Sequence, residues 1–171
     1  MDIQPINVDL YVKKFYLSKE IPKNNYLSQL PVISHLKEMG EINLSKPVTF
    51  LVGENGVGKS TLIEGIAVAM GFNPEGGSIN FNFSTRESHS NLQEYLTVSR
   101  GPSKKTDGFF LRAESFYNFA SNIDELDSQG GFGPPIISSY GGVSLHEQSH
   151  GESFMSLVAN RFSGNGLYIL D

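Results

Sequence analysis

GENGVGKST, from Gly53 to Thr61, fits the spacing G-x-x-x-x-G-K-[ST]. Glycines at these positions allow successive backbone N–H groups to turn toward one anion. Lys59 adds a cation for the outer phosphates, and Ser60 offers a hydroxyl to Mg²⁺. We interpret the stretch as a phosphate-binding loop whose candidate ligands are Gly53, Glu54, Asn55, Gly56, Val57, Gly58, Lys59, Ser60 and Thr61.

The segments on either side of this loop favour the same interpretation. Before it, Val48 to Val52 is a nearly continuous apolar run, which predicts a strand buried on both faces. After it, apolar residues recur at helical spacing from Leu62 to Met70, and Gly71 stands where a left-handed cap would end the helix. The start of such a helix directs its N–H groups and the positive end of its dipole at the anion. Correct segments on both sides disfavour a chance glycine-rich turn.

Length and composition limit the classes of protein. The chain has 171 residues with 39% hydrophobic content, which predicts a single domain over residues 1–171. It has no cysteine, so disulfides and thiolate metal sites are excluded and a reducing cytoplasm is expected. No apolar run approaches the ~18 residues of a membrane span. A net charge of −5 gives no general attraction for nucleic acid.

Periodicity outlines the rest of the chain. Alternation from Ile6 to Val12 predicts a half-buried strand, and Asn91 to Arg100 fits either strand or helix. The stretch from Ser128 to Gly142, rich in glycine and proline, predicts a long connection with no helix. Further elements expected are a short helix over 31–39 closed by Gly40, a loop over 71–91, a short strand over 109–111, a helix over 116–126 and a helix from near Gly151 to Phe162.

The last five residues combine an apolar run with a carboxylate. Leu167 to Leu170 predicts a buried strand, and Asp171 follows at its carboxyl end. Ligands of α/β sheets bind at that end of the strands. In a protein with a phosphate-binding loop, a carboxylate in this place holds Mg²⁺.

Three patterns compete between Gly142 and Glu152. His146 to His150 matches H-E-x-x-H, a zinc motif when it lies on one helix. Gly151 would interrupt that helix, and no suitable third ligand follows. Ser149 and Glu152 form an S-x-x-E capping box, and a serine and a glycine at a helix start also suit an anion. Capping and anion binding are compatible here.

Together, these parts resemble a known family. GENGVGKST, then Gln148-Ser149-His150-Gly151-Glu152, then Leu-Tyr-Ile-Leu-Asp171 is similar to the heads of ABC-class ATPases, especially the SMC/RecF type and the bacterial predicted ATPases grouped with them. The resemblance implies an α/β P-loop NTPase core of the RecA-like class with an N-terminal antiparallel β portion. It also implies ATP and Mg²⁺ as ligands, with Lys59 and Asp171 catalytic and with Ser60 and Asp171 holding the metal.

The same resemblance implies a homodimer around ATP. Lys59 and Ser60 of one chain would meet Ser149, Gly151 and Glu152 of another copy across the nucleotide. Two positions depart from the family pattern: His150 replaces a glycine, and Arg112 and Glu114 are the nearest polar residues where a glutamine is usual. A nucleic-acid or protein partner is left open.

The family also carries sequence beyond the position of Asp171. By resemblance, a catalytic glutamate, a switch histidine and a strand between Val48–Val52 and Leu167–Leu170 would follow, so we expect a C-terminally incomplete sheet and a chain that binds nucleotide without turnover. The favoured function is ATP binding with ATP hydrolysis in the complete protein; the alternative is an ATP-gated interaction module. A GTP switch is disfavoured, because Asp127 to Gly130 matches D-x-x-G but follows a helical pattern.

Overall fold

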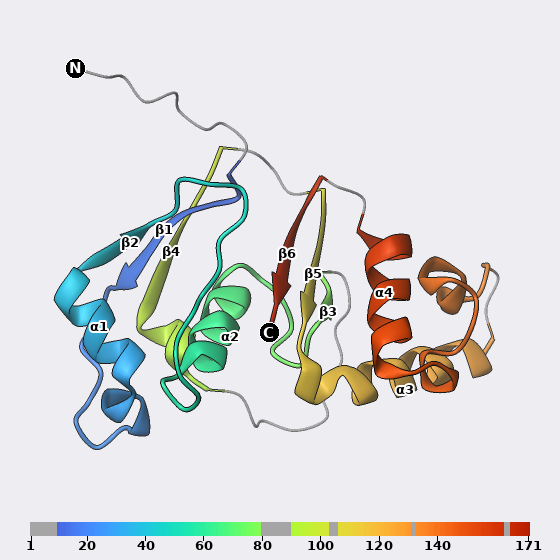
Figure 1. Ribbon diagram of the computed structural model, residues 1–171, viewed down its shortest axis with the longest axis horizontal. Coiled ribbons are helices and arrows are strands. Elements are labelled where there is room, and N and C mark those ends of the chain that lie inside the picture. The colour runs from blue at the N-terminus through green and yellow to red at the C-terminus, as the bar shows by residue number, and fades with distance from the viewer. Residues whose placement is uncertain (1–9, 80–89, 103–105, 131–132, 163–164) are drawn as a thin grey trace. The chain divides into compact units, whose positions relative to one another are not determined.

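The computed structural model describes residues 10–79, 90–102, 106–130, 133–162 and 165–171. Contacts within the chain group it into two compact units, one formed by 1–74 with 85–105 and the other by 75–84 with 106–171. Each is described by itself, and Figure 1 locates the elements. The described residues form a mixed α/β fold with two small sheets, one antiparallel and one mixed. The expectation of a single domain stays a prediction.

The first unit contains the antiparallel sheet. Strand β1 (Val12–Leu17) lies between β2 (Glu41–Asn43) and β4 (Leu96–Arg100), in the order β2-β1-β4. Phe15, at the centre of β1, is buried and pairs with Ile42 on one side and Val98 on the other. This sheet accounts for the N-terminal antiparallel β portion that we expected. Of the alternating stretch that predicted a strand, residues 6–9 lie outside the described residues.

Two predicted helices of the first unit are confirmed. Helix α1 (Pro31–Met39) follows the 3₁₀ helix η1 (Tyr26–Gln29), starts with proline at its first position and ends at Gly40. Helix α2 (Lys59–Ala69) ends at Met70, and Gly71 beyond it has a φ of 91°. Both helices contribute to one apolar core, formed by Phe15, Ile21, Leu27, Ile33, Leu36, Leu62, Leu92 and Leu96.

The prediction of a buried strand at Val48–Val52 is wrong. These residues belong to no strand, and their side chains are exposed, Phe50 by 83% and Val52 by 91%. Apolar and β-branched residues suit the faces of a strand. A strand forms, however, only when the backbone N–H and C=O groups of a neighbouring strand pair with its own. In the described part of the first unit, the sheet ends at β2 and β4 and does not include this segment.

The second unit contains the mixed sheet. Strand β5 (Asp107–Leu111) lies between β3 (Gly77–Ser78), which is antiparallel to it, and β6 (Gly166–Leu170), which is parallel. Helices α3 (Phe116–Ser128) and α4 (His150–Arg161), both close to the predicted ranges, pack on one face of this sheet. The resulting core consists of Phe109, Leu111, Phe116, Phe119, Ala120, Ile123, Tyr140, Leu145 and Leu157.

Three details of the prediction change. Strand β6 is half-buried rather than buried, and Leu170 is 54% exposed, because β6 is the edge of the described sheet. The ambiguous stretch 91–100 holds both a 3₁₀ helix, η2 (Leu92–Glu94), and β4. The connection expected to lack a helix contains the 3₁₀ helix η4 (Ile136–Tyr140), which buries Tyr140.

Two more short 3₁₀ helices precede the long helices of the second unit. They are η3 (Ala113–Ser115), which leads into α3, and η5 (Leu145–Glu147), which precedes α4. Within the described ranges, no helix combines the length and the apolar character needed to cross a membrane.

Candidate functional site

The stretch Gly53–Thr61 forms a turn that opens directly into α2. Gly56 and Gly58 have φ angles of 82° and 96°, in the left-handed region that favours glycine. Gly58 is the N-cap of α2, and the first hydrogen bond of that helix among the described residues runs from the Leu62 N–H to the Gly58 carbonyl, at 3.0 Å. The N–H groups of the preceding helical residues therefore face out of the helix end, as an anion site requires.

Lys59 folds back onto the loop that precedes it. Its Nζ donates to the carbonyl oxygens of Gly53, at 2.9 Å, and Glu54, at 2.7 Å. These two bonds hold the ammonium group over the start of the loop. The structure therefore brings together the cation and the glycine turn that the motif predicts.

The other predicted residues of this loop differ in exposure. Glu54, Asn55 and Ser60 are exposed, whereas Val57 and Thr61 are half-buried. An exposed hydroxyl at Ser60 suits Mg²⁺, which takes few protein ligands and is bound largely by phosphate oxygens and water. The described residues contain no group of three or more His, Asp or Glu side chains that could hold a metal ion.

Asp171 lies immediately after β6. Its backbone N–H donates to the Leu111 carbonyl at 2.9 Å, which extends the parallel ladder by one residue, and its side chain is exposed. The carboxylate is thus at the carboxyl end of two parallel strands, as predicted. Asp171 belongs to the second unit and Ser60 to the first, so a shared Mg²⁺ site stays a prediction.

The start of α1 contacts the phosphate-binding loop, which sequence reasoning missed. The Val32 N–H donates to the Val57 carbonyl at 3.0 Å. A Cβ placed on Gly58 would lie 2.8 Å from Val32 Cγ1 and 3.3 Å from Leu30 Cδ1. One local signal exists: Leu30 is the N-cap of α1 and makes no side-chain cap, so another group must accept from the first N–H groups of this helix.

Close packing fixes the other side of α2. Gly65 faces Leu92, and a Cβ at this glycine would lie 3.0 Å from Leu92 Cδ2. The residue before Gly65 is Glu64, whose buried carboxylate accepts a hydrogen bond from the Ser90 N–H at 2.7 Å. These contacts hold the helix that starts at the phosphate-binding loop against η2.

Helix α4 begins with the predicted capping box. The Ser149 hydroxyl accepts from the Glu152 N–H at 3.4 Å, and the Glu152 carboxylate accepts from the Ser149 N–H at 3.0 Å and from its hydroxyl at 2.6 Å. These bonds favour the ionised form and lower the pKa of Glu152 from its usual 4.5. Gly151 is exposed, and a Cβ there would meet nothing within 4 Å. The helix start is therefore open to a ligand or a second chain.

The two histidines of H-E-x-x-H lie on different elements. His146 is in η5 and His150 is the first residue of α4, so they do not share the helical face that the zinc motif needs. His146 Nε2 is 2.9 Å from the Ser121 hydroxyl, and its imidazole packs against Tyr117. We interpret His146 as a structural contact between η5 and α3.

The D-x-x-G match also has a structural explanation. The two carboxylate oxygens of Asp127 accept from the N–H groups of Ile136, at 2.6 Å, and Ile137, at 2.9 Å. Asp127 therefore fixes the start of η4 to the end of α3. Asp127 therefore has a structural role at this position, and the D-x-x-G match does not require a GTP switch.

After β5, Arg112 and Glu114 occupy the positions where the family pattern has a glutamine. They form an ion pair at 3.3 Å, in which the Glu114 side chain is largely exposed. The Arg112 side chain is mostly buried.

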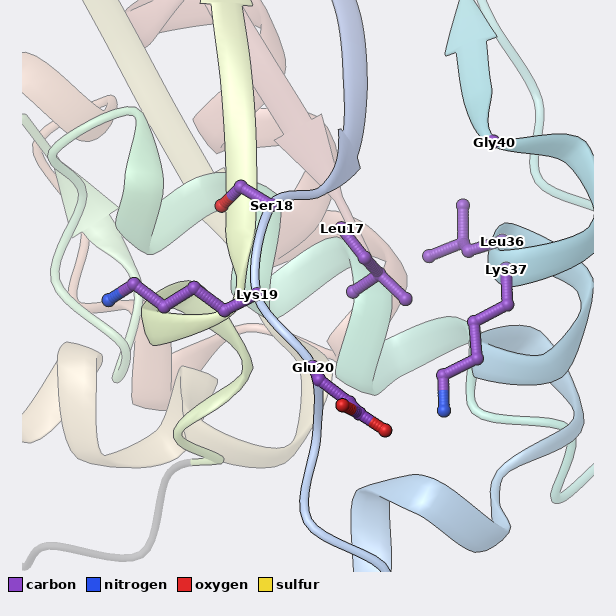
Figure 2. A pocket seen from close by; sticks show the side chains of 7 residues that line it. All are labelled: Leu17, Ser18, Lys19, Glu20, Leu36, Lys37 and Gly40. Carbon is purple, nitrogen blue, oxygen red and sulfur yellow. The ribbon is translucent and has the colours of Figure 1, made fainter.

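A separate pocket of about 410 Å³ lies in the first unit, between the end of β1 and α1. In Figure 2, Leu17 and Leu36 face each other across it, whereas Lys19 points away. Its remaining lining residues are Ser18, Glu20, Lys37 and Gly40. None of its lining residues belongs to Gly53–Thr61, so this pocket is distinct from the predicted nucleotide site.

Comparison with known proteins gives one match. The sequence profile of the family described as AAA domain matches residues 32–125, which is more than half of the chain. The match includes α1 from its second residue, the whole phosphate-binding loop and α2. Searches of curated proteins and of solved structures found no match.

Proposed function

The chain belongs to the AAA domain family, and from this premise we propose that it binds ATP through Gly53–Thr61 and supports Mg²⁺-dependent ATP hydrolysis as an ABC-class head. The family supports nucleotide binding and ATPase-type activity. The assignment to the ABC class rests on the sequence around Ser149 and on Asp171. The single observation that carries the proposal is the Lys59 ammonium group held over a glycine turn at the start of α2.

Each part of the loop has a distinct task in this proposal. The N–H groups at the start of α2 and in the turn receive the phosphates, and Lys59 exchanges its bonds with the Gly53 and Glu54 carbonyls for bonds with the β- and γ-phosphates. Ser60 and Asp171 are the residues that would hold Mg²⁺. When bound, this ion neutralises charge on the outer phosphates.

Replacing Lys59 tests the ATP site. In Lys59→Ala, ATP affinity measured by isothermal titration calorimetry should fall at least about tenfold, because charge-assisted hydrogen bonds typically contribute about 1.5 to 3 kcal/mol. Lys46→Ala, which removes an exposed lysine just before the loop, is the matched control and should bind ATP as the wild type does. Equal ATP affinity in Lys59→Ala and the wild type would refute the assignment.

We further propose that ATP joins two copies of the chain. Ser149 and Gly151, at the open start of α4, would face the γ-phosphate bound by the other copy. Ser149→Asp tests this, because aspartate still caps a helix but repels a phosphate. Light scattering should show ATP-dependent dimers for the wild type and Ser149→Thr, and monomers for Ser149→Asp. Dimers of Ser149→Asp at wild-type strength would contradict the proposal.

A further inference from the structure

We propose that Leu30 and Val32, at the start of α1, are positioning residues for the phosphate-binding loop. This inference rests on the proposed function, because it assigns the support of the same ATP site. Neither residue lies within Gly53–Thr61. They would act on ATP through Val57 and Gly58.

The first argument is the hydrogen bond from the Val32 N–H to the Val57 carbonyl, at 3.0 Å. A trans peptide unit is planar, so its C=O and its N–H point in opposite directions. When α1 holds the Val57 carbonyl, the Gly58 N–H of the same peptide unit must point away from α1. One bond therefore satisfies a free N–H of α1 and also orients a donor of the loop.

The second argument is steric. A Cβ on Gly58 would lie 2.8 Å from Val32 Cγ1 and 3.4 Å from Leu30 Cβ, so these two side chains fill the space behind the glycine. Gly58 has a φ of 96° and caps α2 without a side chain. The left-handed turn at Gly58 is therefore supported from behind by apolar contact and cannot relax toward α1.

The third argument is that the support itself is rigid. Ile33 and Leu36 of α1 are buried in the same core as Leu62 of α2, and Leu30 and Val32 pack against that core. The loop is thus held between two helices that share one core. Because the loop is already ordered, binding of phosphates costs less conformational entropy of its backbone.

The test is Val32→Ala, measured with ATP and with inorganic tripolyphosphate. Both ligands should bind about tenfold more weakly, because even small misplacement of a binding group reduces its effect strongly. Equal loss for the two ligands would show that the effect is on the phosphates and not on the base. Val32→Ile should bind ATP and tripolyphosphate as the wild type does, because it keeps the branched side chain. Ser34→Ala changes an exposed residue of the same helix and should also leave both affinities unchanged.

A purely structural role predicts a different result. Val32→Ala would then lower the melting temperature, while the Kd measured well below it would equal that of the wild type, and this overturns the inference. Binding by Val32→Ile that is as weak as binding by Val32→Ala would also overturn the inference. Leu30→Ala provides a second variant with the same expected loss if Val32→Ala does not fold. If the wild type binds neither ATP nor tripolyphosphate, the proposed function itself fails.

Discussion

The two sides of the phosphate-binding loop behave differently. On the exit side, α2 forms where helical spacing predicts it, and its Leu62 and Ala67 are buried. On the entry side, Val48–Val52 is also rich in apolar residues but forms no strand and is exposed. Both segments adjoin the same loop, so the contrast does not come from the loop.

The difference shows what each kind of element needs. A helix satisfies its backbone N–H and C=O groups within one segment, so residue spacing and caps are enough to predict it. A strand satisfies them on a neighbour that can be distant in sequence, and residue composition says nothing about whether that neighbour is present. We therefore expect mutations on the exit side to affect folding and those on the entry side to have little effect.

Leu62→Ala should give the largest effect. Leu62 is 3% exposed in the core of the first unit, and truncation of a buried leucine typically lowers the free energy of unfolding by about 2 to 5 kcal/mol. Urea unfolding followed by circular dichroism measures the change. A loss below about 0.5 kcal/mol would contradict the expectation that residues on the exit side of the loop stabilise the fold.

A smaller effect is expected at the start of α4, which also forms from local signals. The pKa of Glu152 is lowered because Ser149 donates to its carboxylate, so the capping box stabilises the fold above pH 4.5. This stabilisation should fade as the pH falls through the lowered pKa. Unfolding curves of the wild type and Glu152→Gln should therefore differ near neutral pH and converge in acid. Curves separated by the same amount at every pH would contradict this role.

The smallest effect should come from the entry side. Phe50→Ala removes a large apolar side chain that is 83% exposed, so the free energy of unfolding should change by no more than about 0.5 kcal/mol. The same urea assay provides the measurement. A loss comparable to that of Leu62→Ala would show that Phe50 is covered in solution and would remove the contrast between the two sides.

Local patterns predicted the four α-helices of the described residues. The spacing of apolar residues predicted α2, α3 and α4 to within a few residues, and the positions of proline and glycine predicted α1. S-x-x-E predicted the capping box at Ser149. The failures involve partners that lie outside the element concerned. The start of η4 depends on the Asp127 carboxylate, and the burial of β6 depends on which strands lie beside it.

The candidate site divides in the same way. The motif predicted the glycine turn and the cation, and the structure places the Lys59 ammonium on the Gly53 and Glu54 carbonyls. The contact between Val32 and Val57 was not predictable, because no motif links residues so far apart in sequence. The roles of Ser149 and Asp171 toward ATP stay predictions.

The sheet of the first unit has a consequence for synthesis on the ribosome. Lys14 of β1 pairs with Asn43 on one side and with Ser99 on the other, and the phosphate-binding loop and α2 are made between these two partners. At a translation rate of about 5 to 20 residues per second, β1 would wait roughly three to eleven seconds for its second neighbour. During that interval one edge of β1 exposes unpaired backbone groups, which is the arrangement that promotes aggregation. We therefore expect the emerging chain to be prone to aggregation after the phosphate-binding loop has been made and before β4 has been made.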